Sequence, residues 1–206
     1  MKKILLIFAA LLLVSCTNED YGDLNKDPNN PIEVDAGQLF VAATVTLFDQ
    51  IESTNVNENV FRLFSQYWTQ TTYTDESNYD LASRRVPGRH WNEIYRNVLF
   101  DLKDTKTKTD GDTFKNAQIE VLEVYAWQNL VDTFGNIPYS DALKAKKPDE
   151  LFQPKYDDAA AIYTDLLVRI DSAITALTGS SGSGFGSADL IYGNSRSSWE
   201  KFANSL

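Results

Sequence analysis

The sequence predicts a mainly α protein, in which helices form antiparallel pairs across short polar loops and which also contains long loops. Apolar residues recur at helical spacing in several stretches after Gln38, and no stretch shows the alternation of a half-buried strand. The chain is also rich in aromatic residues, with 4 Trp, 10 Tyr and 11 Phe among its 206 residues. Aromatic content at this level either builds a helical core or lines a ligand surface, and both interpretations are open at this point.

The chain begins with a segment that is typical of export. Two lysines precede an apolar run at residues 4–14, and Cys16, the only cysteine, follows Ser15. This order predicts a signal peptide of residues 1–15, and the cysteine after the cleavage point resembles the lipobox of bacterial lipoproteins, where the thiol is acylated, for example with palmitate. A membrane-spanning helix needs about 20 apolar residues, so the run is too short to be one. The alternative is an ordinary signal peptide followed by a coincidental cysteine.

Residues 16–36 are predicted to form a lipidated tether and an irregular lead-in, because they are rich in Asn, Asp and Pro. Four of them alternate as in the first half of a calcium-binding loop: Asp23, Asn25, Asp27 and Asn29. The pattern then fails, since Pro28 stands where such a loop needs Gly and Val34 where it needs a bidentate Glu. We therefore favour a turn-rich segment and expect no metal site.

Two helices are predicted before residue 69. In the first, which starts near Gln38, four apolar residues share one stripe: Leu39, Ala43, Leu47 and Ile51. In the second, Phe61, Phe64 and Trp68 follow one another on a single face. Residues 69–89 are rich in Thr, Tyr, Ser and Asn and close with Pro87-Gly88, so they are predicted to form a long loop.

Two further helices are predicted at residues 90–108 and Thr113–Phe134. The first has a core-facing stripe that consists of Trp91, Ile94, Tyr95, Val98 and Leu102. The second is apolar nearly all round, which is typical of a helix buried between neighbours. Gly135 ends it, and Pro138 prevents it from resuming. Trp91 and Trp127 are accordingly assigned to packing between helices.

The last two predicted helices cover residues 157–178 and a segment that begins near Ser197. The former carries seven apolar residues on one face: Ala159, Tyr163, Leu166, Leu167, Ile170, Ile174 and Leu177. The pairs 90–108 with 113–134, and 157–178 with the last helix, resemble tetratricopeptide-type repeats of irregular spacing. The last helix stops soon after it begins, and we therefore expect the chain to be a fragment of a longer protein.

Composition and charge exclude several classes of function. The formal net charge of −10 at pH 7 has the wrong sign for binding the phosphates of nucleic acid. His90 is the single histidine, so neither a Cys/His pair nor a Cys/His metal cluster can be built. His90 is interpreted as a surface or capping residue. Pairs of acids that are consecutive in the sequence, such as Asp75 and Glu76, are interpreted as solvated carboxylates. We expect a noncatalytic protein that needs no cofactor.

The loop of residues 69–89, with the residue before it, is the candidate ligand surface. Sugar binding needs flat aromatic faces with amides or carboxylates beside them. The candidate ligand-binding residues are Trp68, Tyr73, Asn78 and Tyr79. For Trp68, packing in the core is the favoured interpretation, whereas Tyr73 and Tyr79 lie outside the apolar stripe. Alternatively the loop contacts a partner protein, because interfaces also favour Tyr and Trp.

Four segments resemble, in the same order, those of one known family. They are Asp23–Asn29, Trp91–Tyr95, Leu130–Ala142, and Asp189–Asn194 with the following Trp199–Leu206. On these motifs the chain resembles, over almost its whole length, the N-terminal portion of SusD/RagB-type (SusD-like) outer-membrane nutrient-binding lipoproteins of Bacteroidota. The resemblance implies a SusD-like α-superhelix of tetratricopeptide-like repeats, with residues 37–206 as its N-terminal part.

The resemblance also implies a function. Proteins of this family capture glycans, or in some branches peptides, at the cell surface and form a lid on a SusC-like TonB-dependent transporter. The chain is therefore expected to be anchored to the outer leaflet of the outer membrane through Cys16, to bind an oligosaccharide and to act with that transporter. Two alternatives stay open: a peptide-capturing RagB-type lipoprotein, and a noncatalytic helical-repeat scaffold that contacts only a partner protein.

Overall fold

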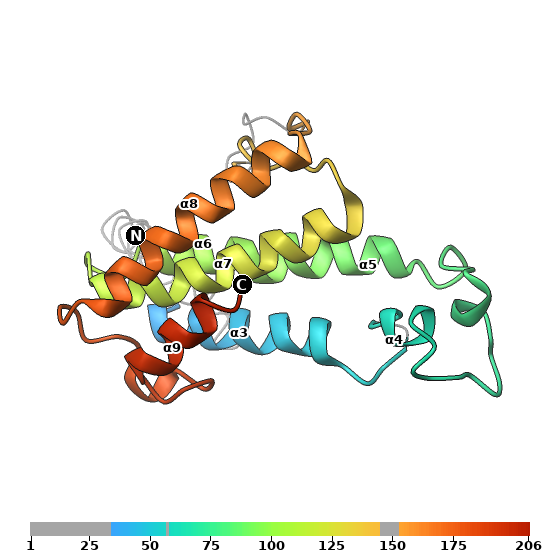
Figure 1. The fold of residues 1–206 in the computed structure, drawn as a ribbon, viewed down its shortest axis with the longest axis horizontal. Coiled ribbons are helices and arrows are strands. Elements are labelled where there is room, and N and C mark those ends of the chain that lie inside the picture. Colours follow the sequence, from blue (N-terminus) through green and yellow to red (C-terminus); the bar gives the residue numbers. More distant parts are fainter. Residues whose placement is uncertain (1–33, 57, 145–152) are drawn as a thin grey trace, which may run out of the picture. The chain divides into compact units, whose positions relative to one another are not determined.

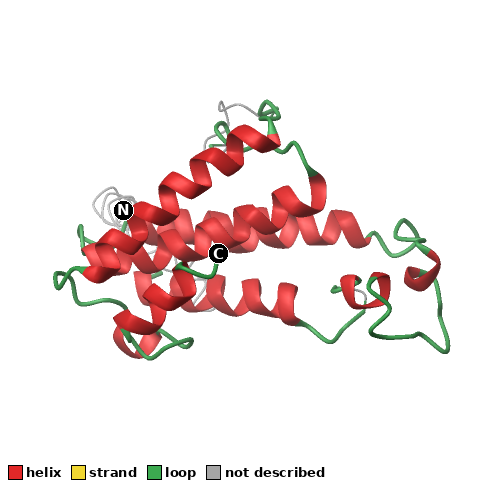
Figure 2. Cartoon of the chain, in the orientation of Figure 1, coloured by secondary structure: helices red, strands yellow, loops and turns green. Residues whose placement is uncertain are grey.

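The computed structural model describes residues 34–56, 58–144 and 153–206. The predicted signal peptide, Cys16, most of the tether and the calcium-like pattern lie outside the described residues. Within them, Figure 2 shows helices connected by loops and no strand, and Ile137 and Asp157 form an isolated antiparallel bridge. The predicted mainly α fold class is confirmed.

Helix α3 (Ala36–Glu52) opens the compact unit that comprises Asp35–Leu206. The carboxylate of Asp35 caps it by accepting hydrogen bonds from two backbone N–H groups of the first turn, at 2.7 and 3.1 Å. Its buried face consists of Phe40, Ala43, Thr44, Leu47 and Gln50. The predicted stripe is therefore confirmed at Ala43 and Leu47, whereas Leu39 and Ile51 are half-buried at its edges.

The predicted second helix is much shorter in the structure. Helix α4 (Phe61–Phe64) has only four residues, and the chain then turns through Gln66, whose φ of +61° lies in the left-handed region. This turn takes Trp68 off the face of Phe61 and Phe64, and Trp68 is 40% exposed. The interpretation of Trp68 as a core residue is wrong for this reason.

A continuous helical run follows, made of α5 (Val86–Asn92), the π-helix η2 (Glu93–Leu99) and α6 (Phe100–Lys106). The run begins before residue 90, and Pro87 lies in its first turn. Backbone N–H groups there have no hydrogen-bond acceptor within the helix, so a proline, which lacks this group, costs no helical hydrogen bond. Pro87-Gly88 thus belongs to the helix and not to the loop. In the predicted stripe, Ile94, Val98 and Leu102 are fully buried, and Trp91 and Tyr95 pack half-buried against the core.

Helix α7 (Thr113–Phe134) is buried between neighbours, as its apolar sequence predicts. The side chain of Asp112 caps it by accepting a hydrogen bond of 2.8 Å from the N–H of Lys115. At the other end, Gly135 takes a φ of +73°, which only glycine adopts without strain. Trp127 is 4% exposed, so its predicted packing role is confirmed.

The Leu130–Ala142 motif forms the last turn of α7 and the start of the connection to α8. The carboxylate of Asp157 accepts hydrogen bonds from the N–H groups of Tyr139 and Ser140, at 3.1 and 2.7 Å. The amide oxygen of Asn136 accepts one of 3.0 Å from the N–H of Ala159, the first residue of α8. The motif therefore positions the N-terminus of the next helix.

Helices α8 (Ala159–Thr178) and α9 (Arg196–Ala203) follow. The buried residues of α8 are Ile162, Leu166, Ile170, Ala173 and Leu177. Leu167, which was predicted on the same face, is 61% exposed, because one residue along a helix is a rotation of about 100° away from Leu166. The hydroxyl of Ser195 caps α9, which begins within a residue of the predicted start.

Helix α7 contacts most of the other helices (Figure 1). It packs extensively on α8 and less on α6 and α9, while α3 packs on η2 and α6. Both predicted helix pairs are in contact, since α6 touches α7 and α8 touches α9. The apolar faces of all these helices meet in one core, which includes Phe40, Leu102, Leu122, Leu166 and Trp199.

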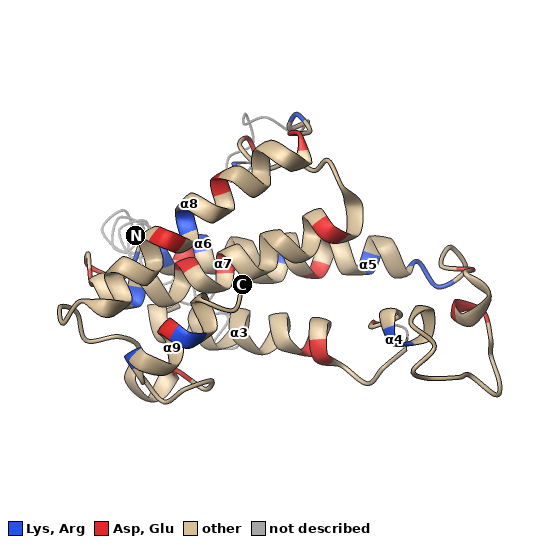
Figure 3. Ribbon diagram, in the orientation of Figure 1, with Lys and Arg blue, Asp and Glu red and all other residues tan. Residues whose placement is uncertain are grey.

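Charged side chains cross-link α6, α7 and α8 beside this core. Arg169 of α8 pairs with Glu120 and Glu123 of α7, and Lys106 of α6 pairs with Glu120 at 2.7 Å. Burial opposes ionisation of Glu120, but the hydrogen bonds and charges of Arg169 and Lys106 outweigh it, and the pKa of Glu120 is lowered. Figure 3 accordingly shows acidic and basic residues interspersed along these helices.

Candidate ligand-binding surface

The predicted ligand-binding residues all lie between α4 and α5, in residues 65–85, which we call the aromatic loop (Figure 1). A 3-10 helix, η1 (Glu76–Asn78), lies in its middle. The rings are largely accessible: Trp68 is 40%, Tyr73 79% and Tyr79 69% exposed, and Asn78 is exposed beside them. The loop therefore presents several aromatic side chains to solvent.

The aromatic loop folds around the side chain of Glu76, which is fully buried. Its Oε2 accepts a hydrogen bond of 2.8 Å from the amide of Gln70, and its Oε1 lies 3.1 Å from Nε of Arg84. The N–H and hydroxyl of Ser77 donate to the amide oxygen of Gln70, at 3.0 and 2.7 Å. The interpretation of Glu76 as a solvated acid is wrong, because these groups enclose its carboxylate inside the turn.

Each exposed ring packs on a different support. The guanidinium of Arg84, which also pairs with Asp75 at 3.3 Å, lies 5.8 Å from the ring centroid of Tyr73. The ring of Tyr79 stacks on Phe64 with centroids 4.9 Å apart and planes inclined by 23°. Tyr73 and Tyr79 both have positive φ, at 54° and 63°, a conformation that bulky residues adopt only where their surroundings enforce it.

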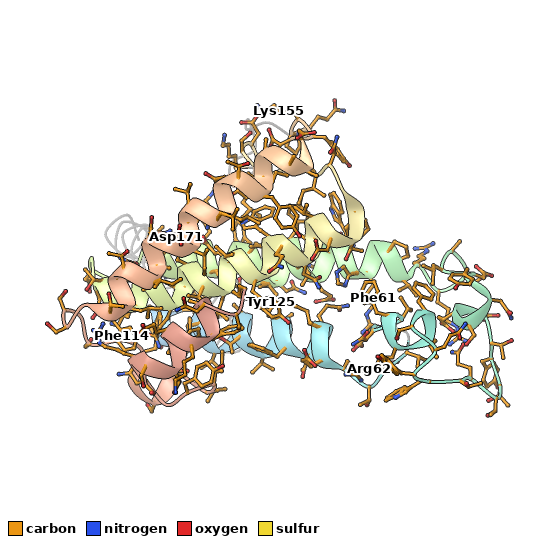
Figure 4. The ribbon with its side chains drawn as sticks, in the orientation of Figure 1. Phe61, Arg62, Phe114, Tyr125, Lys155 and Asp171 are labelled. Carbon is orange, nitrogen blue, oxygen red and sulfur yellow. The ribbon has the colours of Figure 1, made fainter. Side chains whose placement is uncertain are left out.

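Trp68 is supported from α4. The guanidinium of Arg62 lies 5.1 Å from its ring centroid and donates hydrogen bonds to the carbonyls of Ser53 and Glu52 at the end of α3, at 3.0 and 3.1 Å. Figure 4 labels Arg62 and Phe61 on α4, next to the aromatic loop. Asn78 is held locally, since its amide donates to the hydroxyl of Thr74 at 3.1 Å. The structure thus places the four candidates on one loop, with a separate anchor for each.

His90 lies in α5, the helix that follows the aromatic loop, and it is 5% exposed. Its Nδ1 lies 3.0 Å from the amide nitrogen of Gln50, and its Nε2 lies 2.7 Å from the amide oxygen of Asn129. Because the Gln50 nitrogen can only donate, Nδ1 accepts and Nε2–H donates, which is the neutral tautomer. Burial lowers the pKa of His90. The prediction of a surface or capping residue is wrong, since His90 links α3, α5 and α7.

The sequence did not indicate that Glu76 and His90 are buried and hydrogen-bonded. One available signal was Gln50, a polar residue three positions after Leu47 on the apolar stripe of α3, because a buried amide needs a hydrogen-bonding partner. For metal binding, the described ranges hold no group of three His, Cys, Asp or Glu side chains placed to coordinate an ion. None of the helices in the described part is both long and apolar enough to cross a membrane.

Comparison with known proteins identifies relatives. A family model described as "Starch-binding associating with outer membrane" matches residues 28–206. Among solved structures, the chain is similar to a chitin-binding protein (24% identity, TM-score 0.67). It is also similar to a SusD-like protein from Bacteroides thetaiotaomicron VPI-5482 (22%, 0.65) and to a chitin-binding SusD homologue from Flavobacterium johnsoniae (24%, 0.54). No curated protein matches the chain.

The three matches cover most of this chain but only part of each solved chain. The match to the chitin-binding protein covers 83% of this chain and 37% of that protein. The corresponding values are 83% and 36% for the Bacteroides thetaiotaomicron protein, and 81% and 37% for the Flavobacterium johnsoniae protein. The chain therefore spans little more than a third of the length of these structures. With identities below 25%, the structural similarity establishes the fold, and the family match rests on residues 28–206.

Proposed function

The chain belongs to the SusD-like family of starch-binding proteins that associate with the outer membrane, and from this premise we propose that it captures oligosaccharides at the cell surface. The family consists of binding proteins and not of enzymes, and two of the similar structures have names that describe chitin binding. Binding would rest on stacking and hydrogen bonds, with no cofactor.

The observation that carries this proposal is the set of supported, exposed rings on the aromatic loop. A pyranose ring stacks on a flat aromatic face, and a ring that is already fixed loses little conformational freedom on binding. Trp68, Tyr73 and Tyr79 are each backed by a cation or a ring, and the exposed amide of Asn78 is available for sugar hydroxyls. These four residues are the proposed ligand-binding set.

The remainder of the proposal concerns location and partner. Residues 1–15 would be removed on export, Cys16 would carry the lipid, residues 16–36 would serve as tether, and residues 37–206 would belong to the SusD-like helical domain. The lipid would hold the protein on the outer face of the outer membrane, beside a SusC-like TonB-dependent transporter that takes up the captured glycan. The family description supports association with the outer membrane.

Isothermal titration of the full-length protein with maltohexaose and chitohexaose tests the ligand proposal. We expect one of them to bind, and Trp68→Ala, Tyr73→Ala and Tyr79→Ala each to weaken binding at least about two- to tenfold, since one aromatic stacking contact contributes about 0.5–1.5 kcal/mol beyond its buried area. Tyr156→Ala is the matched control, because Tyr156 is 64% exposed but lies outside the aromatic loop. Its affinity should equal that of the wild type.

Two outcomes favour the alternatives. Binding of a peptide library, with no response to either glycan, would indicate a peptide-capturing RagB-type lipoprotein. Retention of the transporter in a pull-down, without binding of glycan or peptide, would indicate a scaffold that contacts only its partner. In that case the rings of the aromatic loop would belong to a protein interface, where Tyr and Trp are also enriched.

A further inference from the structure

A pocket of about 310 Å³ is lined in part by Leu81 of the aromatic loop, but by none of the loop's exposed rings. Its walls come from residues 58–64, from residues 81–90 and from the C-terminal end of α7. Six apolar side chains form most of the lining: Val60, Phe61, Phe64, Leu81, Val86 and Phe134. Phe61 (Figure 4) is 46% exposed, so the pocket opens to solvent on this side.

The polar side chains in the wall are already engaged with protein groups. Both ring nitrogens of His90 bond to the amides of Gln50 and Asn129, as described above. The hydroxyl of Thr133 donates to the carbonyl of Asn129 at 2.7 Å, and the carboxylate of Glu58 forms an ion pair. A polar occupant would have to compete for these groups, whereas an apolar occupant leaves every one of these bonds intact. The lining thus selects against charge and hydrogen-bonding capacity.

The volume sets the size of the occupant. An apolar cavity of about 150 Å³ holds one benzene molecule, and pockets for small ligands begin near about 300 Å³. A volume of about 310 Å³ therefore suits one aromatic ring, or one branched alkyl group, with a few additional atoms. Filling it would remove the exposed parts of Phe61, Phe64 and Leu81 from water, which is the favourable contribution.

We propose that this pocket is a binding site for an uncharged apolar group, either a single aromatic ring or a branched alkyl group. The group could be a free small molecule or a side chain of a larger ligand, and both present the same chemistry to the lining. The proposal does not depend on glycan binding, because the rings of Trp68 and Tyr73 do not line this pocket. Phe64 connects the two features, since it lines the pocket and stacks on Tyr79.

Methyl NMR of the full-length protein, labelled at Leu and Val, tests the proposal with toluene and with acetyl-phenylalanine amide as probes. We expect saturable shifts at the methyl groups of Val60, Leu81 and Val86, and none at Leu167 and Val168 on the exposed face of α8. Shifts with toluene alone would identify a site for free molecules, and shifts with both probes a site that also accepts a side chain.

A variant in which a larger side chain fills the pocket, compared with the same change on an exposed surface, provides the decisive test. Leu81→Phe adds bulk at the wall and should weaken toluene binding at least about tenfold. Leu167→Phe makes the same change on an exposed surface, and it should bind like the wild type. If Leu81→Phe does not fold, Phe61→Trp at the exposed rim is the second variant. The absence of shifts at the three lining residues with both probes, or equal binding in the filled and control variants, would overturn the proposal.

Discussion

The indole Nε1 of Trp199 donates a hydrogen bond of 2.6 Å to Oδ2 of Asp189, and both side chains are buried. The same carboxylate accepts a hydrogen bond of 3.1 Å from the amide of Gln118 and others from three backbone N–H groups of the loop, those of Ile191, Tyr192 and Asn194. One buried anion thereby joins this loop to α7 and α9. Asp189–Asn194 and Trp199, which resemble family motifs, form a single structural unit.

Replacing Trp199 by Phe should destabilise the protein. The substitution keeps a ring in the core but removes the donor to a buried carboxylate, and hydrogen bonds to charged groups contribute about 1.5–3 kcal/mol. With the lost volume, we expect the free energy of unfolding to fall by about 2–4 kcal/mol in urea denaturation followed by circular dichroism. Trp68→Phe, at an exposed ring, should change it by less than about 0.5 kcal/mol. Equal losses in the two variants would contradict this role of the indole.

Glu76→Gln should loosen the aromatic loop without loosening the helices. The amide can still accept from Gln70 but forms no ion pair with Arg84, whose side chain is 32% exposed, so the cost is about 1–2 kcal/mol. Hydrogen exchange read by mass spectrometry should accelerate about tenfold in residues 70–84 and stay unchanged in α7. Asp75→Asn removes the more exposed partner of Arg84 and should have a smaller effect. Equal acceleration in α7 and in the loop would show that Glu76 supports the whole fold.

The helices were largely predictable because their signals are local. Helical spacing of apolar residues identified α7 and α8, and Gly135 marked the end of α7. The errors at the ends have physical causes as well. Pro87 can begin a helix as well as interrupt one, and nothing local to Phe61–Trp68 indicates that Gln66 adopts a left-handed conformation.

The surroundings of single polar residues were not predictable, because they depend on contacts far apart in the sequence. The buried state of His90 requires Gln50 and Asn129, each about 40 residues away. Glu76 has nearer partners, but its burial depends on how residues 70–84 close around it, which sequence periodicity does not describe. Tyr73 and Tyr79 were predicted as ligand-binding candidates because they lie outside the apolar stripe, and their exposure is a finding of the structure.

The buried neutral state of His90 predicts a pH dependence of stability. Burial lowers its pKa in the folded protein, so below the ordinary value of about 6.5 the unfolded chain binds more protons than the folded one. The stability contributed by the neutral imidazole is complete above that value and is lost as the pH falls through it. Urea denaturation of the wild type and of His90→Gln at pH 7.5 and pH 5 measures this pH dependence. Between the two pH values, the free energy of unfolding should fall less for the variant than for the wild type. An identical pH dependence would contradict it.

Cys16→Ala should release the protein from membranes. If Cys16 carries the lipid, its replacement removes acyl chains that each contribute about 0.8 kcal/mol per buried CH2 group. In fractionated cells the wild type should sediment with the outer membrane, and the variant should appear in the soluble fraction. Ser15→Ala keeps the cysteine and serves as the control. Unchanged sedimentation of Cys16→Ala would count against lipidation at this residue.

Gly184 and Gly186 provide a matched pair for the loop that precedes α9. Both have positive φ, at 70° and 57°, so an alanine at either position incurs backbone strain of about 1–2 kcal/mol. They differ in their surroundings: a Cβ at Gly184 would overlap Oδ1 of Asn194 and lie 2.5 Å from the ring of Phe114, whereas a Cβ at Gly186 meets no atom within 4 Å.

Gly184→Ala should therefore be the more destabilising of the two. Overpacking against Phe114 adds about 1–3 kcal/mol to the strain, so we expect a loss of about 2–5 kcal/mol, against about 1–2 kcal/mol for Gly186→Ala. Urea denaturation of both variants measures the difference. Phe114→Leu is itself destabilising because Phe114 is buried, but the double variant with Gly184→Ala should lose less stability than the sum of the two single losses, because the smaller side chain makes room for the methyl group. Equal losses in the two single variants would mean that the loop does not lie against Phe114 as the structure places it.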